Sequence, residues 1–129
     1  MHFATFHDLE DQSVFITGGG SGIGADLTRG FLSQGAKVTF IQRSYPEKIL
    51  AECEGKYKHD LSFIQCDVTD TKELKRAVRA TVKKQGPISI LVSNAANDTR
   101  HTLGDFTSEQ WDDAMNVNLK PHFLLLKKW

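Results

Sequence analysis

Near its N-terminus the chain carries the stretch Ser13-Val14-Phe15-Ile16-Thr17-Gly18-Gly19-Gly20-Ser21-Gly22-Ile23-Gly24. Its first residues are mainly apolar and predict a strand, which ends where the glycines begin. After the glycines, Ile23, Leu27 and Phe31 recur at the spacing of one helix face, and the pattern stops at Gly35, a typical C-cap residue. The stretch therefore predicts a strand, a tight turn and the start of a helix, in that order.

A turn of this kind is suited to hold a phosphate. Glycine lets the chain turn sharply, lets the backbone approach an anion and lets the helix pack closely on the strand. The free N–H groups and the positive dipole end of the helix then face the anion. An ordinary flexible turn is the alternative, but strand, glycines and amphipathic helix follow each other as a phosphate-binding turn requires.

The spacing of these residues resembles the nucleotide-binding motif of the short-chain dehydrogenase/reductase family, Thr-Gly-x-x-x-Gly-Ile-Gly. The resemblance implies a Rossmann-like fold and hydride transfer between a nicotinamide cofactor, NAD or NADP, and a small alcohol, carbonyl or sugar substrate. It also implies which residues of the turn bind the cofactor: Gly18, Ser21, Gly22, Ile23 and Gly24.

Length and composition are those of an ordinary globular domain. The chain has 129 residues, 40% hydrophobic and 25% charged, and a formal net charge of zero, which argues against a nucleic-acid or acidic-membrane partner. No segment has the apolar run of a signal peptide or a membrane span, so we expect a cytoplasmic protein. Cys53 and Cys66 have no second metal-type ligand at short spacing, and both are expected to be reduced structural thiols without a metal.

Strands and helices are predicted to alternate along the chain. Further strands are expected at residues 37–42, 61–66 and 88–93. Helices are expected from Pro46, from Asp70 with Glu73 in a capping box, and from Thr107 with Gln110 three residues on. This alternation predicts an α/β fold, a doubly wound parallel sheet that is incomplete, with about four strands, over residues 1–129. In such a sheet the ligand lies at the carboxyl ends of the strands.

The end of the second strand bears on the choice of cofactor. NAD is usually held there by an acid, whereas the 2′-phosphate of NADP requires a cation. This chain has Gln42 followed by Arg43, which favours NADP. Two alternatives stay open: Arg43 is a solvated surface residue, or Gln42 hydrogen-bonds the ribose of NAD.

Asp67 and Val68 follow the third strand. The resemblance implies that the Asp67 carboxylate accepts a hydrogen bond from the adenine amine and that the Val68 backbone meets the ring. From the residues alone, Asp67 is a turn residue and Asp70 is the N-cap of the next helix; both readings are compatible.

The fourth strand ends in Ser93-Asn94-Ala95-Ala96, similar to the family's Asn-Asn-Ala-Gly. Ser93 and Ala96 depart from that pattern, and Ala96 adds a Cβ where the family has none. Asn94 and Ala95 are implied to line the ribose and nicotinamide side. The polar residues 97–101 lie where the family contacts substrate, and they resemble members that oxidise aldoses; a solvated loop is the alternative.

Asn118 is the candidate catalytic residue in this chain. It shares a helix face with Trp111 and Met115, and a buried amide there must find partners. The segment 116–119 resembles the family's Asn-x-Asn-Leu, whose second Asn holds a water of the proton relay at a helix irregularity. Pro121 favours such a kink. A purely structural asparagine is the alternative.

The remaining catalytic groups of the family are absent from this sequence. The family uses a serine and a Tyr-x-x-x-Lys pair, whereas neither Tyr45 nor Tyr57 has a Lys four residues later. The last residues, 127–129, continue a helical pattern without a cap, so we expect the N-terminal part of a longer enzyme, inactive by itself. A stand-alone dinucleotide-binding or redox-sensing module and a methyltransferase-like domain are the alternatives.

A sheet of four parallel strands leaves the edge of the fourth strand uncovered. We therefore expect a poorly soluble or oligomeric chain, with homo-oligomers in the complete form. Trp111 and Phe123 are interface residues or core residues in this interpretation.

Overall fold

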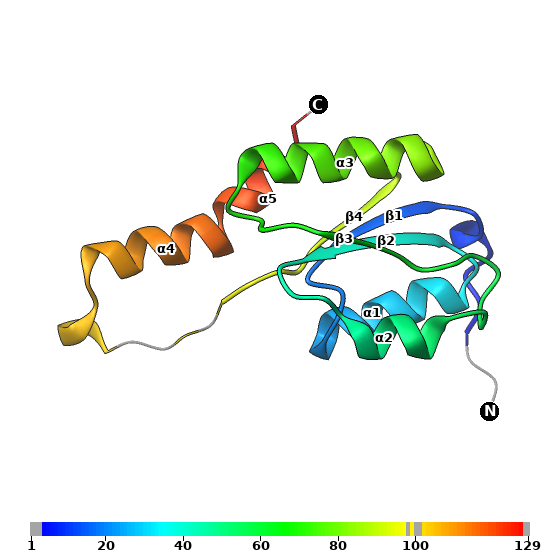
Figure 1. Cartoon of the computed structure of the whole chain (residues 1–129), viewed down its shortest axis with the longest axis horizontal. Helices are drawn as coiled ribbons and strands as arrows, with labels where there is room; N and C mark the ends of the chain where they lie inside the picture. Colours follow the sequence, from blue (N-terminus) through cyan, green and yellow to red (C-terminus); the bar gives the residue numbers. More distant parts are fainter. Residues whose placement is uncertain (1–3, 98, 100–101, 128–129) are drawn as a thin grey trace.

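The computed structural model describes residues 4–97, 99 and 102–127. Its centre is a parallel sheet of four strands in the order β3-β2-β1-β4, and Figure 1 shows this sheet between two layers of helices. The predicted α/β fold with about four parallel strands is confirmed. The strands are β1 (Ser13–Thr17), β2 (Lys37–Gln42), β3 (Ser62–Gln65) and β4 (Ile90–Ser93).

The helices cover both faces of the sheet. In Figure 1, α1 (Gly22–Ser33) and α2 (Glu47–Cys53) lie on one face, and α3 (Thr71–Gln85) and α5 (Lys120–Leu125) lie on the other. The helix α4 (Ser108–Asn118) extends away from the sheet (Figure 1). Two 3-10 turns, His7–Leu9 and Leu103–Asp105, complete the described elements. The strand order reverses between β1 and β4, which is where a doubly wound sheet binds its ligand.

The core has two halves because side chains alternate between the faces of each strand. Val14 and Ile16 pack with α1 and α2, whereas Phe15 packs with α3 and Leu124 of α5. All five residues of β1 are buried, as expected for the central strand of a sheet that is covered on both faces.

Two strands are shorter than predicted. The segments 61–66 and 88–93 form strands only over Ser62–Gln65 and Ile90–Ser93. Leu61 and Ile88 are apolar but pack against the core from outside the hydrogen-bonded ladder. At the start of both strands, the apolar segment of the sequence is therefore longer than the segment that is hydrogen-bonded to a neighbouring strand.

The predicted apolar face of α1 is wrong at its first member. Ile23 is 75% exposed, while the buried positions include Ala25, Thr28 and Leu32. The buried face of α1 includes Thr28, whose hydroxyl donates to carbonyl oxygens of the glycine turn. A pattern of apolar residues alone therefore misplaces the buried face of this helix.

The two predicted capping boxes differ. Thr107 and Gln110 form a complete box at the start of α4. Asp70 caps α3 by accepting from the N–H groups of Lys72 and Glu73, but Glu73 does not return to Asp70; its Oε2 accepts from the N–H of Asp67, 3.1 Å away. The second half of the box thus stabilises the turn after β3.

The last predicted helix is two helices. Leu119 leaves helical geometry with φ −124° and ψ −53°, and Pro121 lies at the start of α5. The break at Asn118 agrees with the irregularity that Pro121 predicts. The side chains of Trp111 and Phe123 are exposed, so neither belongs to the core that the described residues form.

Both cysteines are buried and unpaired, as predicted. Within the described ranges no group of three or more His, Cys, Asp or Glu side chains is placed to hold a metal ion. No helix in the same part of the chain combines the length and the apolar character that a bilayer span requires.

Candidate functional site

The glycine turn between β1 and α1 has a specific geometry at two positions. Gly22 has φ +53°, a left-handed conformation that L side chains rarely adopt, and a Cβ there would meet nothing within 4 Å. A Cβ on Gly24 would lie 1.9 Å from the carbonyl oxygen of Gly18. Gly22 therefore gives the chain its turn and leaves open space, and Gly24 lets α1 approach the turn.

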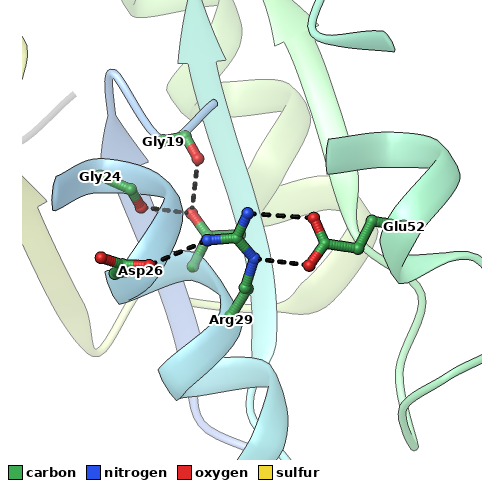
Figure 2. A network of polar contacts seen from close by, with 6 residues as sticks. Gly19, Gly24, Asp26, Arg29 and Glu52 are labelled. Atoms are coloured by element: carbon green, nitrogen blue, oxygen red, sulfur yellow. Dashed lines mark hydrogen bonds and ion pairs between the residues drawn. The ribbon is translucent and has the colours of Figure 1, made fainter. Parts of the chain in front are cut away.

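Thr28 closes the turn from inside the helix. Its buried hydroxyl lies 2.9 Å from the carbonyl oxygens of both Gly19 and Gly24, the two glycines labelled in Figure 2. The neighbouring Arg29 reaches outward in Figure 2 to Asp26 and, with two nitrogens, to the carboxylate of Glu52 on α2. One turn of α1 thus holds the glycine turn on one side and the second helix on the other.

The N-terminus of α1 is open to a ligand. The first bond of the helix runs from the N–H of Ala25 to the carbonyl oxygen of Ser21, 3.1 Å away. Ser21 is the exposed N-cap residue and its side chain makes no cap hydrogen bond. The preceding N–H groups of the helix have no acceptor further back in it, which makes this end a favourable place for an anion.

A cleft of about 1010 Å³ runs along the carboxyl ends of the strands. All the residues predicted to bind the cofactor line this one cleft, although they come from four separate segments of the sequence. They are Gly18, Ser21, Gly22, Ile23, Gly24, Gln42, Arg43, Asp67, Val68, Asn94 and Ala95. The exposure of Ile23, unexpected for a core residue, is explained by its place in the cleft wall.

Thr17 joins β4 to the glycine turn. Its hydroxyl oxygen accepts from the N–H groups of Asn94 and Ala95, each at 2.9 Å. The amide nitrogen of Asn94 in turn donates to the carbonyl oxygens of Thr17 and Gly18, at 3.2 and 3.1 Å. Asn94 therefore lines the cleft with its amide donors directed to the turn. The sequence identified Thr17 only as a member of the glycine motif and did not reveal that it binds the backbone after β4.

At the end of β2 the polar side chains are turned in different directions. The amide nitrogen of Gln42 donates to the carbonyl oxygen of Ser44 at 2.8 Å, and its Oε1 lies where a Cβ on Gly20 would stand. Gln42 thus covers the glycine turn. The side chain of Arg43 is 80% exposed, and its Nε lies 3.8 Å from Oδ2 of Asp67.

Asp67 is held as a carboxylate. Hydrogen bonds from the hydroxyl and the N–H of Thr69, at 2.7 and 2.9 Å, lower the pKa of Asp67, and the charge of Arg43 lowers it further against the opposing effect of burial. Its neighbour Cys66 lines the same cleft, where burial raises the pKa of the thiol to about 12. Cys66 is therefore a neutral wall residue, in line with the predicted structural thiol.

Asn118 does not line the cleft but fixes a residue that does. Its Oδ1 accepts from the N–H of Asn97 at 2.7 Å, and its Nδ2 donates to the carbonyl oxygen of Asn97 at 2.8 Å. The amide found partners, as predicted, but it is half-buried, and α4 has no fully buried residue. Sequence reasoning missed three neighbours on α4 that line the cleft: Asp113, Asn116 and Val117.

Ser93 and Ala96, the two residues at and after the end of β4 that depart from the family pattern, have different surroundings. The hydroxyl of Ser93 is hydrogen-bonded to Nδ1 of His122 on α5, which connects the sheet edge to that helix. Ala96 is an exposed residue of the cleft wall. Of the predicted substrate loop 97–101, residues 98, 100 and 101 lie outside the described part of the chain.

Three comparisons with known proteins bear on this site. A family model described as "short chain dehydrogenase" matches residues 12–129. A probable galactose dehydrogenase of Rhizobium meliloti is 41% identical over 126 residues, covering 93% of this chain and 48% of that protein. A D-xylose 1-dehydrogenase of Caulobacter vibrioides is 39% identical over 122 residues, covering 93% of this chain and 47% of that protein.

The comparison with solved structures also finds short-chain dehydrogenases. A short-chain dehydrogenase of Burkholderia cenocepacia, solved in complex with NADP, superimposes with a TM-score of 0.83 at 27% identity, covering 90% of this chain and 48% of the other. The chain thus spans about half the length of the relatives and structures it matches.

Proposed function

Because the chain belongs to the short-chain dehydrogenase family, we propose that it is the dinucleotide-binding part of an oxidoreductase that moves a hydride between a nicotinamide cofactor and an alcohol or carbonyl compound. The observation that carries the proposal is the cleft at the strand ends, which begins at a glycine turn and an open helix N-terminus. Residues 1–129 form one dinucleotide-binding part in this proposal.

The residues of the cleft fit such a cofactor. The open space beside Gly22 and the first N–H groups of α1 suit the pyrophosphate, since a side chain at Gly22 would stand where the anion approaches. Asp67, a hydrogen-bond acceptor, and Val68, an apolar wall, suit the adenine. Asn94 and Ala95 suit the ribose and nicotinamide end. When bound, the nicotinamide supplies the hydride chemistry.

We assign Asn118 a positioning role in the reaction. Its amide holds the backbone of Asn97, which lies in the cleft wall next to Ala95 and Ala96. The helix ends directly after it, at Leu119, and this irregularity supports a water-holding role in the proton relay. The proton donor itself has to come from residues other than Tyr45 and Tyr57, neither of which lines the cleft.

NADP is the proposed preference. Arg43 is the cation of the cleft at the end of β2, it is exposed, and its ion pair with Asp67 is long, so the guanidinium is free to turn to a 2′-phosphate. The last residue of β2 is Gln42, which is uncharged, whereas an acid at this position would repel the phosphate.

Calorimetric titration of the chain with NADP and NAD tests both the proposed binding of a dinucleotide and the proposed preference for NADP. We expect binding of both, tighter for NADP, and a loss of that preference in Arg43→Gln. S-adenosylmethionine serves as the control ligand, because its binding in place of either dinucleotide would favour a methyltransferase-like domain. Absence of dinucleotide binding by a folded chain overturns the proposal, and a preference that survives Arg43→Gln overturns the role of Arg43.

An aldose is the proposed substrate class of the whole enzyme. The similarity to a galactose and a xylose dehydrogenase supports it, and so does the polar Asn97, which lines the cleft in the segment after β4. The chain alone is proposed to be inactive because the family's catalytic serine and its Tyr-x-x-x-Lys pair have no counterpart in this sequence. Reduction of NADP by this chain in the presence of galactose, xylose or other aldoses would contradict its inactivity.

A cytoplasmic location is also part of the proposal. So is self-association of the chain through the exposed apolar side chains of α4 and α5. Leu119, Phe123 and Leu126 are all more than half exposed. Sedimentation of the chain as a monomer at high concentration would argue against self-association.

A further inference from the structure

A second cavity, of about 370 Å³, lies beside the cleft. Its lining is polar and consists of Arg43, Gln65, Asp67, Glu73 and Arg76. Arg43 and Asp67 line both cavities, so their ion pair stands at the boundary between them. The second cavity therefore adjoins the adenosine end of the proposed cofactor site, and α3 contributes Glu73 and Arg76 to it.

The two arginines of this cavity are loosely held. Arg43 lies 3.8 Å from Asp67, and Arg76 lies 3.7 Å from Glu73, distances too long for hydrogen bonds. Their side chains are 80% and 75% exposed. Exposed ion pairs of this kind contribute little to stability, so either guanidinium is able to turn to a new partner at little cost.

The two carboxylates have closer partners of their own. Oδ1 of Asp67 accepts from the N–H and the hydroxyl of Thr69, and Oε2 of Glu73 accepts from the N–H of Asp67. The backbone of Arg43 is held as well, since the amide of Gln65 donates to its carbonyl oxygen at 2.8 Å. The frame of the cavity is thus fixed, while the two guanidinium groups are its movable parts.

We propose that the second cavity receives the 2′-phosphate of NADP and that Arg76 is the second guanidinium on this phosphate, a specificity-determining residue supplied by α3. Guanidinium groups bind phosphate through paired N–H donors, and two of them match a phosphate dianion in charge. The proposal rests on the function proposed above, because it places a part of the same cofactor.

The charges of the lining favour a cofactor phosphate over a free phosphate ion. Two arginines and two carboxylates face the cavity, so its formal charge is zero. A free anion gains little net attraction there, whereas the phosphate of a bound nucleotide is already held near the arginines by contacts of the adenosine.

Arg76→Gln tests the proposal with Arg79→Gln as its matched control. Arg79 carries the same charge on the same helix, further along by one turn, and lines neither of the two cavities. The probes are adenosine 2′,5′-bisphosphate and adenosine 5′-monophosphate, which differ only in the 2′-phosphate, titrated into the full chain by calorimetry.

We expect Arg76→Gln to weaken the bisphosphate about five- to tenfold and to leave the monophosphate unchanged, since one charged hydrogen-bonding partner is lost. Arg79→Gln should change neither. Glu73→Gln should act in the opposite direction and tighten the bisphosphate about twofold or more, because a repelling charge next to the phosphate is removed. Thermal melting of each variant establishes that it is folded.

Other results overturn the proposal in distinct ways. An equal loss for both nucleotides in Arg76→Gln assigns its effect to the fold, and no loss for the bisphosphate places the phosphate elsewhere. Equal affinity of the unmodified chain for the two nucleotides refutes the phosphate subsite but leaves dinucleotide binding intact. Binding of neither nucleotide nor of NADP refutes the proposed function together with this inference.

Discussion

The side chain of Asn118 holds both backbone polar groups of Asn97: its Oδ1 lies 2.7 Å from the N–H nitrogen and its Nδ2 lies 2.8 Å from the carbonyl oxygen. The last residue of α4 is thereby attached to the segment that leaves β4. A single amide satisfies a donor and an acceptor of a chain segment without regular structure, which fixes the cleft wall beside Ala96.

Asn118→Leu should release this segment. Both hydrogen bonds are lost, and we expect the amide proton of Asn97 to exchange with solvent about five- to tenfold faster, a local loss of about 1–1.5 kcal/mol. Asn118→Asp is the control that keeps an acceptor for the N–H but faces the carbonyl oxygen with a carboxylate, so its effect should be intermediate. Unchanged exchange in both variants, followed by NMR, would show that the contact does not hold the segment.

Gly24→Ala should be strongly destabilising. The new Cβ would lie 1.9 Å from the carbonyl oxygen of Gly18, so the turn or the helix has to move, at a cost of about 3 kcal/mol. Gly30→Ala is the matched control in the same helix, where a Cβ meets nothing within 4 Å and should stabilise by about 0.5–1 kcal/mol. Urea unfolding of the two variants measures the difference, and similar midpoints would contradict the close approach.

Thr28→Val should loosen the glycine turn. Valine keeps the shape but removes the hydroxyl near the carbonyl oxygens of Gly19 and Gly24, and we expect a loss of about 1–2 kcal/mol together with weaker dinucleotide binding. Thr28→Ser keeps the hydroxyl and loses only a buried methyl, so its affinity for the dinucleotide should stay close to that of the unmodified chain. Titration calorimetry separates the two, and equal affinities would assign Thr28 to packing alone.

Thr69→Val should change the acid side of the stability curve. Because hydrogen bonds from Thr69 lower the pKa of Asp67 in the folded chain, ionised Asp67 stabilises the fold above its unfolded value of about 3.9, and this contribution disappears as the pH falls through the lower folded value. The variant should therefore lose less stability between about pH 5 and pH 2 than the unmodified chain. NMR titration of the Asp67 carboxyl should show its pKa rising towards the ordinary value. Because the variant keeps the N–H of residue 69, an unmoved pKa would reject the Thr69 hydroxyl as a cause.

Much of the fold could be predicted because local patterns control it. The glycine stretch, the apolar strand of residues 37–42 and the Thr107–Gln110 capping box each act within a few residues, and each has the predicted form in the structure. Predictions based on apolar character alone were less accurate. Ile23 is exposed in the cleft wall, and Leu61 and Ile88 lie outside the strands. Hydrophobicity alone does not distinguish a cleft residue from a core residue, or a residue that packs beside a strand from one that is paired in it.

The residues of the candidate site could be named from motifs, but their partners could not. Asn94 lines the cleft, where it was expected, but the sequence did not reveal that its amide donates to Thr17 and Gly18, more than 70 residues earlier in the chain. Glu73 was expected to cap its own helix and instead binds the backbone of Asp67. A side chain with several possible hydrogen-bonding partners binds the one that folding brings near, and the spacing of residues in the sequence does not reveal that distance.

The sequence by itself determined the order of strands and helices, the turn that suits a phosphate and the segments that meet at the carboxyl ends of the sheet, since periodicity and glycine geometry are properties of short stretches. Only the tertiary structure decided that Asn118 holds Asn97 and that Arg76 of α3 shares a cavity with Arg43. Those relationships depend on distances between segments, which are set by the packing of helices on the sheet.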